Sequence, residues 1–233
     1  EDKVALVDQN GNRKTTFKEL DETSSLVSGK IHALHIKKQS FIMISCGRNT
    51  EYVSAFLGIL KAGCIVVPIN NEYPKDRIDF INNDANCALI IDEIFFKDLK
   101  EYAPYEDLGL EDDKSILLYT SGSTGTPKGI LYTIHDIDFC MNRKAALNMF
   151  NENDIQANLA HFTFTVIMED LFFHLLNGCT VHILSDEVRK NVELISNYYE
   201  EHNITCGYLP PTVLKIFKSK SNTLKTILTG SER

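Results

Sequence analysis

Long apolar runs and an excess of basic residues are both missing from this sequence of 233 residues. No apolar run approaches the roughly 20 residues that a helix needs to cross a bilayer. The formal net charge is −8, so the chain lacks the basic face with which proteins bind nucleic acid. We therefore expect a protein that binds neither membranes nor nucleic acid.

Closely spaced cysteines are also missing. The chain has no CxxC pair, on which zinc sites and redox motifs depend. Several cysteines lie inside apolar runs, so we expect small buried side chains without disulfides, in a reducing cytoplasm. His32 and His35 are three residues apart on a predicted helix, but no further ligand lies nearby, and no metal site is expected there. The cysteines are Cys46, Cys64, Cys87, Cys140, Cys179 and Cys206.

Strand and helix signals alternate along the whole chain. Asn10-Gly11 lies between the short segments 4–7 and 14–17 and predicts a hairpin. Beyond it, the alternation is typical of a parallel sheet covered by helices. Helices are predicted at 17–34, 50–61, 75–83, 137–150, 167–176, 188–202 and 212–218. Strands are predicted at 4–7, 14–17, 41–45, 64–69, 88–92, 115–119, 130–134, 154–162, 180–184, 205–209 and 224–229.

An acidic segment that contains proline, 102–114, is the best candidate for a boundary. The prediction is an α/β fold with two stacked lobes, 1–104 and 105–233, each a mainly parallel sheet covered by helices. The second lobe would carry the segments that are chemically most informative. A chain of this length with 43% hydrophobic content can bury the cores of both lobes.

The most informative segment is LLYTSGSTGTPKG, Leu117 to Gly129. Glycine permits positive φ and close approach, so backbone N–H groups and hydroxyls in such a loop can surround an anion. Lys128 adds a cation, but it precedes Gly129, whereas the P-loop needs Ser or Thr after its lysine. The segment predicts a polyphosphate site of another type. Its members would be Thr120, Ser121, Gly122, Ser123, Thr124, Gly125 and Lys128.

In this form the segment resembles the signature loop of the adenylate-forming superfamily. That superfamily includes acyl-CoA synthetases, luciferases and the adenylation domains of nonribosomal peptide synthetases, and the last branch fits best. The resemblance covers the whole chain and implies part of the large N-terminal domain of such an enzyme, although the segment before the loop is shorter than usual. Further matching motifs follow in the family's order: TTFKEL (15–20), LKAGCIVVPIN (60–70), HFTFTVIMEDLFFHLLNG (161–178), ITCGYLPPT (204–212) and LKTILTGSER (224–233).

The resemblance implies that a carboxylic acid attacks the α-phosphorus of ATP, with Mg²⁺ present, and that pyrophosphate leaves. The acyl group would then pass to the phosphopantetheine thiol of a carrier protein domain. An acyl- or aryl-CoA synthetase is one alternative, and a non-catalytic nucleotide-binding or protein-interaction module is another. The family's Mg²⁺-binding glutamate, ribose-binding aspartate and catalytic lysine would lie beyond Arg233. The chain is therefore expected to be a fragment with no catalytic residue or metal ligand of its own, and inactive alone.

The resemblance also assigns binding residues. Gly230, Ser231 and Glu232 match the small-residue segment under the adenine ring, and His161 is a possible neighbour of the α-phosphate. The acid pocket would be lined by Thr165, Val166, Glu169, Tyr208, Leu228 and Gly230.

Thr165 is a departure from the family pattern. Amino-acid-activating domains usually carry an aspartate at this position for the substrate's α-ammonium, and a register two residues earlier would place Thr163 there instead. A threonine hydroxyl cannot supply the charge of that contact. Either the substrate has no α-amino group, or Glu169, four residues further along the same helix face, holds it.

Overall fold

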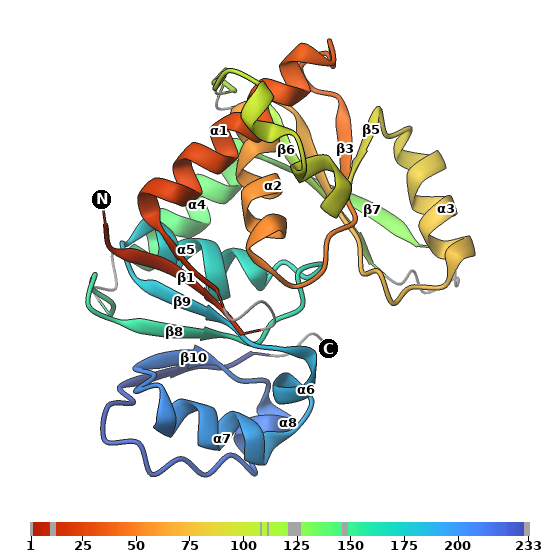
Figure 1. Cartoon of the computed structure of the whole chain (residues 1–233). Coiled ribbons are helices and arrows are strands. Elements are labelled where there is room, and N and C mark those ends of the chain that lie inside the picture. Colours follow the sequence, from red (N-terminus) through yellow and green to blue (C-terminus); the bar gives the residue numbers. More distant parts are fainter. Residues whose placement is uncertain are drawn as a thin grey trace. The chain divides into compact units, whose positions relative to one another are not determined.

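The computed structural model of the chain describes residues 2–9, 13–107, 109–110, 112–120, 127–145 and 149–230. The chain forms two compact units, which Figure 1 colours along the sequence. Unit 1 consists of Glu1–Phe17 and Met141–Arg233, and unit 2 consists of Lys18–Cys140. Each unit is built on its own sheet.

Unit 2 has a five-stranded sheet in the order β5-β3-β4-β6-β7, parallel except for the antiparallel pair β6–β7. Helices α2 and α3 lie on opposite sides of it (Figure 1). Its strands are β3 (Phe41–Ile44), β4 (Ile65–Pro68), β5 (Leu89–Ile91), β6 (Lys114–Thr120) and β7 (Lys128–Thr133). Its helices are α1 (Phe17–Ala33), α2 (Thr50–Lys61), α3 (Lys75–Ala85), the 3₁₀ turns η1 (Glu93–Phe96) and η2 (Leu99–Glu101), and α4 (Ile134–Ala145), which continues into unit 1.

Local residues explain where α2 begins and how closely it packs. The Asn49 side chain accepts a hydrogen bond from the Tyr52 N–H at 3.0 Å and caps the helix. Gly63 follows its end with a φ of +65°, a conformation that glycine adopts without strain. At Gly58 a methyl group would lie 2.5 Å from Cγ1 of Val27, so glycine is what lets α2 approach α1 this closely.

Unit 1 has a six-stranded sheet in the order β11-β10-β8-β9-β1-β2, parallel except for the predicted hairpin β1–β2. Its strands are β1 (Val4–Asp8), β2 (Arg13–Thr16), β8 (Ile155–Asn158), β9 (Thr180–Ile183), β10 (Cys206–Tyr208) and β11 (Thr226–Leu228). Its helices are the π-helical turn η3 (Met168–Phe172), α5 (Phe173–Leu176), α6 (Asp186–Arg189), α7 (Val192–Glu201) and α8 (Pro211–Leu214). The predicted α/β fold with mainly parallel sheets is confirmed.

Side chains alternate along β8 and so cover both faces of this sheet. Ile155 and Ala157 belong to an apolar cluster with Ile195 and Tyr199 of α7. The side chains of Gln156 and Asn158 point to the other face and donate hydrogen bonds to the carboxylate of Asp170 in η3. In Figure 1, α7 and α5 accordingly lie on opposite sides of these strands. The end of β8 is therefore fixed from both sides.

The units divide the chain differently from the predicted lobes 1–104 and 105–233. β6 follows the predicted boundary, yet it pairs with β4 through Val66 and Ile116, and so belongs to the sheet of unit 2. β1 precedes the boundary, yet it pairs with β9 in unit 1. Pairing between strands that are distant in sequence, which composition does not reveal, sets the division.

Two predicted elements are shorter or broken. The predicted helix 188–202 is two helices, because the Asn191 side chain accepts hydrogen bonds from Glu193 N and Leu194 N and starts α7 anew. The predicted strand 154–162 ends at Asn158, because the next two backbone N–H groups bond to a side chain. Helix 137–150 begins earlier, at Ile134.

All six cysteines are free, and four of them are buried, as the sequence predicts. Burial raises the pKa of the Cys206 thiol to about 12, so this thiol stays neutral. Cys140 is exposed. Within the described ranges, no helix combines the length and apolar character that a bilayer crossing requires.

Candidate functional site

The predicted polyphosphate loop connects the two antiparallel strands of unit 2. β6 ends at Thr120 and β7 begins at Lys128, and these two residues face each other across the ladder. The Thr120 hydroxyl donates to the Lys128 carbonyl at 3.5 Å, and both side chains are exposed. The strands predicted on either side of this segment are confirmed. Ser121, Gly122, Ser123, Thr124 and Gly125 lie outside the described residues.

The stem of this loop is anchored by Tyr119. Its hydroxyl donates to Oδ2 of Asp84, near the end of α3, at 2.6 Å. Burial and this carboxylate both raise the pKa of Tyr119, so the phenol stays protonated. A methyl group at Gly129 would come within 2.9 Å of Leu117 Cδ1 and 3.4 Å of the Tyr119 ring. A methyl group there would press on the end of the Leu117 side chain, so Gly129 packs closely against the strand that precedes the loop.

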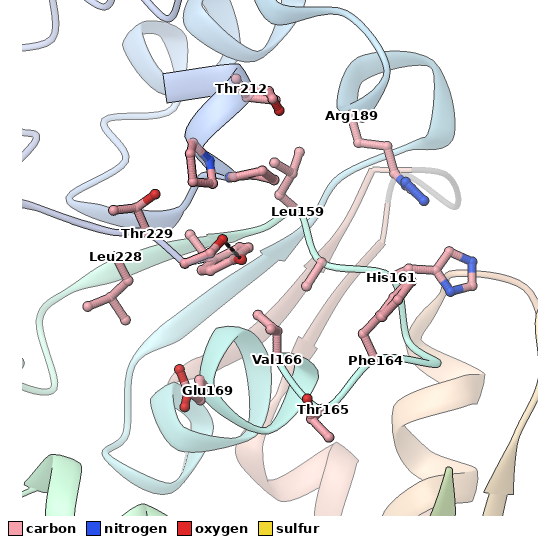
Figure 2. Close-up of a pocket in the computed structure, with 16 residues that line it drawn as sticks. Leu159, His161, Phe164, Thr165, Val166, Glu169, Arg189, Thr212, Leu228 and Thr229 are labelled. Atoms are coloured by element: carbon pink, nitrogen blue, oxygen red, sulfur yellow. Dashed lines mark hydrogen bonds between the residues drawn. The ribbon is translucent and has the colours of Figure 1, made fainter. Parts of the chain in front are cut away.

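Unit 1 contains a cavity of about 800 Å³ between the end of β8, η3, and the ends of β10 and β11 (Figure 2). Parallel strands place their carboxyl ends at one edge of the sheet, which is where ligands bind in open α/β folds. The six predicted pocket residues Thr165, Val166, Glu169, Tyr208, Leu228 and Gly230 all line it, and so does His161. Other lining residues are Leu159, Ala160, Phe164, Arg189, Pro210, Pro211, Thr212, Val213 and Thr229.

The ends of β10 and β11, which form one wall of the cavity, are joined by a backbone hydrogen bond from Leu209 to Leu228 and by a side-chain hydrogen bond. The Tyr208 hydroxyl donates to the carbonyl of Gly230 at 2.5 Å, as the dashed line in Figure 2 shows. Gly230 is thereby fixed at the cavity edge. Ser231 and Glu232, which complete the predicted adenine segment, lie outside the described residues.

A fully buried carboxylate, Asp170, holds the opposite wall. Oδ1 accepts from Gln156 Nε2 at 2.5 Å, and Oδ2 accepts from Asn158 Nδ2 at 2.8 Å. Oδ2 also accepts the backbone N–H groups of Leu159 at 2.9 Å and Ala160 at 2.7 Å. Buried carboxylates need such partners, and donors to a charged group contribute more than neutral ones. This cluster ties η3 to the segment that leaves β8.

Because Asp170 is held inside, its neighbour Glu169 faces the cavity. The chain passes here through a π-helical turn, in which the Phe173 N–H donates to the Met168 carbonyl. Such turns are rare and occur often at functional sites. Glu169 is half-buried and supplies the sole acidic side chain among the described residues of the lining.

Basic groups lie at the other side of the cavity. In Figure 2, Glu169 is at the lower left, whereas His161 and Arg189 are at the right. His161 Nδ1 lies 2.9 Å from Thr163 Oγ1 and accepts from the Thr163 N–H at 3.3 Å, which leaves the ring proton at Nε2. The Arg189 guanidinium is paired with Asp186 at 3.0 Å, one turn back in α6. The cavity therefore has a basic side and an acidic side, with apolar walls between them.

The sequence reasoning did not find Arg189 or Asp170. Arg189 lies 20 residues beyond Glu169, in a segment without a recognisable motif. Asp170 could have been noticed, because it stands in the mainly apolar run VIMEDLFFHLL, where a buried acid must find partners.

Mg²⁺, which the family resemblance implies, has no evident protein site in the described part of the chain. No group of three His, Cys, Asp or Glu side chains there could hold a metal ion. The cavity supplies one carboxylate and one imidazole from opposite sides, which does not suit an ion that prefers several oxygen ligands.

Comparison with known proteins agrees with the fold and the motifs. Bacitracin synthase 1 from Bacillus licheniformis is 28% identical over 241 residues, which is 95% of this chain and 5% of that protein. Gramicidin S synthase 2 from Brevibacillus brevis is 28% identical over 244 residues, which is 94% of this chain and 5% of that protein. The chain thus spans about one twentieth of the length of these relatives.

A solved structure shares the fold. It is the N-terminal subdomain of NpsA from Klebsiella oxytoca in complex with 3-hydroxyanthranilyl-AMSN, with a TM-score of 0.85 at 22% identity. The match covers 99% of this chain and 62% of that one. The model of the family described as "AMP-binding enzyme" matches residues 1–109 and 96–233. The chain therefore belongs to the AMP-binding enzyme family, and its predicted resemblance to adenylate-forming ligases is confirmed.

Proposed function

We propose that the protein activates a carboxylic acid with ATP, as an acyl-adenylate, and passes the acyl group to the phosphopantetheine thiol of a carrier protein domain. The observation that carries this proposal is the cavity of unit 1, because one cavity gathers all six residues that the family resemblance assigns to the acid. Its volume, about 800 Å³, is in the range of small-molecule sites.

The chemistry requires a positioned acid more than a reactive side chain. A carboxylate oxygen of the substrate forms a bond to the α-phosphorus, and the bond from that phosphorus to the oxygen bridging to the β-phosphate breaks. Pyrophosphate leaves with the electron pair. In the second step the thiol sulfur attacks the acyl carbon, the thiol proton is lost, and AMP leaves. Such transfers depend mainly on alignment and charge stabilisation.

Thr120, Lys128 and the loop between them would hold the β- and γ-phosphates. Both described ends of the loop, Thr120 and Lys128, have exposed side chains, and the hydrogen bond from Tyr119 to Asp84 anchors the strand that precedes them. A lysine at this position places a positive charge beside the leaving pyrophosphate. His161, with its proton at Nε2, is a donor at the basic side of the cavity and is the candidate neighbour of the α-phosphate. Gly230, with Ser231 and Glu232, would support the adenine ring.

The acceptor is proposed to be a carrier protein because bacitracin synthase 1 and gramicidin S synthase 2 belong to the peptide synthetase branch that the sequence motifs favour. An acyl- or aryl-CoA synthetase is the alternative and would use the same first step. The alternative of another class is a non-catalytic nucleotide-binding or protein-interaction module. A protein-interaction module is disfavoured, because it would need neither the segment rich in hydroxyls and glycine nor a cavity for a small molecule.

The test is ATP–pyrophosphate exchange by the full-length protein over a panel of acids. Exchange that depends on one acid supports adenylate formation, and transfer of the labelled acyl group to a carrier domain but not to CoA supports the proposed acceptor. Lys128→Ala should lower kcat/KM for ATP by about 100-fold. The matched control is Lys100→Ala, an exposed lysine of η2 that should leave exchange unchanged. Exchange insensitive to Lys128→Ala would contradict the phosphate role.

A further inference from the structure

We propose that the cavity of unit 1 accepts a linear ω-amino acid, in which an aliphatic chain separates the carboxylate from a protonated amine, and that Glu169 binds the amine. This inference rests on the proposed function, since it names the acid to be activated. The amine of such an acid would lie at the side of Glu169, and its carboxylate at the side of His161 and Arg189.

The distribution of charge is the first argument. Glu169 is the acidic side chain of the described lining, and it lies across the cavity from Arg189 and His161 (Figure 2). The two charges of an α-amino acid are separated by a single carbon, so both would fall at the same side. A substrate with charges at its two ends matches both sides at once.

The walls between the two sides are the second argument. Leu159, Val166, Val213 and Leu228 line the cavity with aliphatic groups that suit methylene carbons. A cation placed among them without a partner would be strongly disfavoured. Aliphatic amines are protonated at neutral pH, so the amine of the substrate needs an anion, and Glu169 is the described lining residue that can provide one.

Thr165 is the third argument. It lines the cavity four residues before Glu169 and carries only a hydroxyl. A hydroxyl does not compensate an ammonium as a carboxylate does. The family position for an α-ammonium is therefore occupied by a neutral side chain, while the carboxylate of the described lining lies four residues further along the chain.

Both charged sides are held in place before a ligand binds. Asp170, the next residue after Glu169, is fixed by four hydrogen bonds, two of them from backbone N–H groups. Arg189 is held by Asp186, and its side chain is only 17% exposed. Groups that are already oriented lose little entropy when they bind a ligand.

A set of five-carbon acids isolates the position of the amine. Valerate has no amine, 2-aminovalerate has it beside the carboxylate, and 5-aminovalerate has it at the far end. In ATP–pyrophosphate exchange by the full-length protein, we expect kcat/KM for 5-aminovalerate to exceed that of the other two by about 30-fold or more. Benzoate tests an aryl acid of similar length.

Variants of Glu169 test its role directly. Glu169→Gln should remove the preference for 5-aminovalerate over valerate, and a circular dichroism spectrum equal to that of the original protein shows that the variant folds. Glu169→Lys should instead gain exchange with glutarate, whose far end is a second carboxylate. The control is Glu201→Gln, an exposed glutamate at the end of α7, which should change neither preference.

The outcomes separate the two proposals. A preference for 5-aminovalerate that Glu169→Gln abolishes supports the inference. Exchange that prefers valerate, 2-aminovalerate or benzoate, or a preference for 5-aminovalerate that survives Glu169→Gln, overturns it and leaves the proposed function standing. Absence of exchange with every acid overturns both.

Discussion

Oδ2 of Asp170 accepts the backbone N–H of Ala160 at 2.7 Å, which joins the π-helical turn η3 to the segment that leaves β8. Leu159, Ala160 and His161, which line one side of the cavity, follow β8 directly. Glu169, which lines another, precedes Asp170 in η3. One buried carboxylate therefore positions two walls of the cavity and ends a strand.

Removing this carboxylate should destabilise unit 1. In Asp170→Ala, the buried donors of Gln156, Asn158 and Leu159 and the half-buried N–H of Ala160 lose their acceptor. An unsatisfied buried donor costs about 1–3 kcal/mol, so we expect a loss of at least about 3 kcal/mol in the free energy of unfolding, measured by urea denaturation followed by circular dichroism. Amide hydrogen exchange at Leu159 and Ala160 should accelerate.

Asp170→Asn should be milder, with a loss of about 1–2 kcal/mol. The amide oxygen can take the place of Oδ2, and the Gln156 amide can turn its Oε1, which has no hydrogen-bond partner in the described part of the chain, toward the new amide group. Glu201→Ala, at an exposed position, should stay within about 0.5 kcal/mol. Equal losses for Asp170→Ala and Glu201→Ala would contradict the role of the cluster.

Gly207 of β10 leaves space for the side chain of Tyr199 of α7. A methyl group at Gly207 would lie 1.9 Å from the Tyr199 hydroxyl oxygen, and Tyr199 is completely buried. Gly207→Ala should therefore lower the free energy of unfolding by about 1–3 kcal/mol through overpacking. Gly47→Ala is the control, because its nearest neighbour would be 3.7 Å away.

The same pair offers a rescue. The Tyr199 hydroxyl has no hydrogen-bond partner among the described residues, so Tyr199→Phe removes an atom without breaking a bond. The double variant Gly207→Ala with Tyr199→Phe should be more stable than Gly207→Ala alone, and thermal denaturation of all four forms measures the coupling. Additive losses would show that the hydroxyl does not cause the strain.

His182 of β9 should make stability depend on pH. Burial lowers its pKa to about 4, and nearby His202 and Lys14 add to this effect. An unfolded histidine has a pKa of about 6.5, so between these values the unfolded chain binds more protons than the folded one. The stabilisation by neutral His182 is complete above pH 6.5 and is lost as the pH falls toward 4, by about 3 kcal/mol in total.

Denaturation by urea at several pH values between 7 and 4.5 tests this. His182→Gln keeps a partner for the Tyr198 hydroxyl, which lies 2.9 Å from His182 Nδ1, but it cannot titrate. The loss of stability over this range should be about 2 kcal/mol smaller in the variant. His35→Asn, at an exposed position with a φ of 57° that asparagine tolerates, should keep the full dependence. A slope unchanged by His182→Gln would refute the assignment.

The elements whose ends are marked by local chemistry were predictable. The range of α2 was predicted residue for residue, since Asn49 caps its start and Gly63 follows its end. Strand 154–162 was predicted too long, because the acceptor that ends it, Asp170, is 10 residues further along from Ala160. Local pattern does not reveal such partners.

In the candidate site too, some residues could be predicted from the sequence and others could not. Glu169, Tyr208 and Leu228 come from three separate motifs and line one cavity, as the family resemblance implies. The resemblance could predict this because it rests on the known fold of the family. Arg189 was not predicted, because its position at the cavity depends on the direction that the chain takes from β9 into α6. The two-unit division depends on the pairing of β1 with β9 and of β4 with β6, which only the folded chain reveals.

The central claim is that the acid attacks the α-phosphorus of ATP, and transfer of oxygen tests it most directly. An acid labelled with ¹⁸O in its carboxylate is converted to product with ATP and the acyl acceptor by the full-length protein, and the nucleotide and phosphate products are examined by mass spectrometry. Adenylate formation predicts AMP that carries one ¹⁸O atom from the acid, with unlabelled pyrophosphate. Unlabelled nucleotide together with ¹⁸O in inorganic phosphate would mean attack at the γ-phosphorus and would contradict the account.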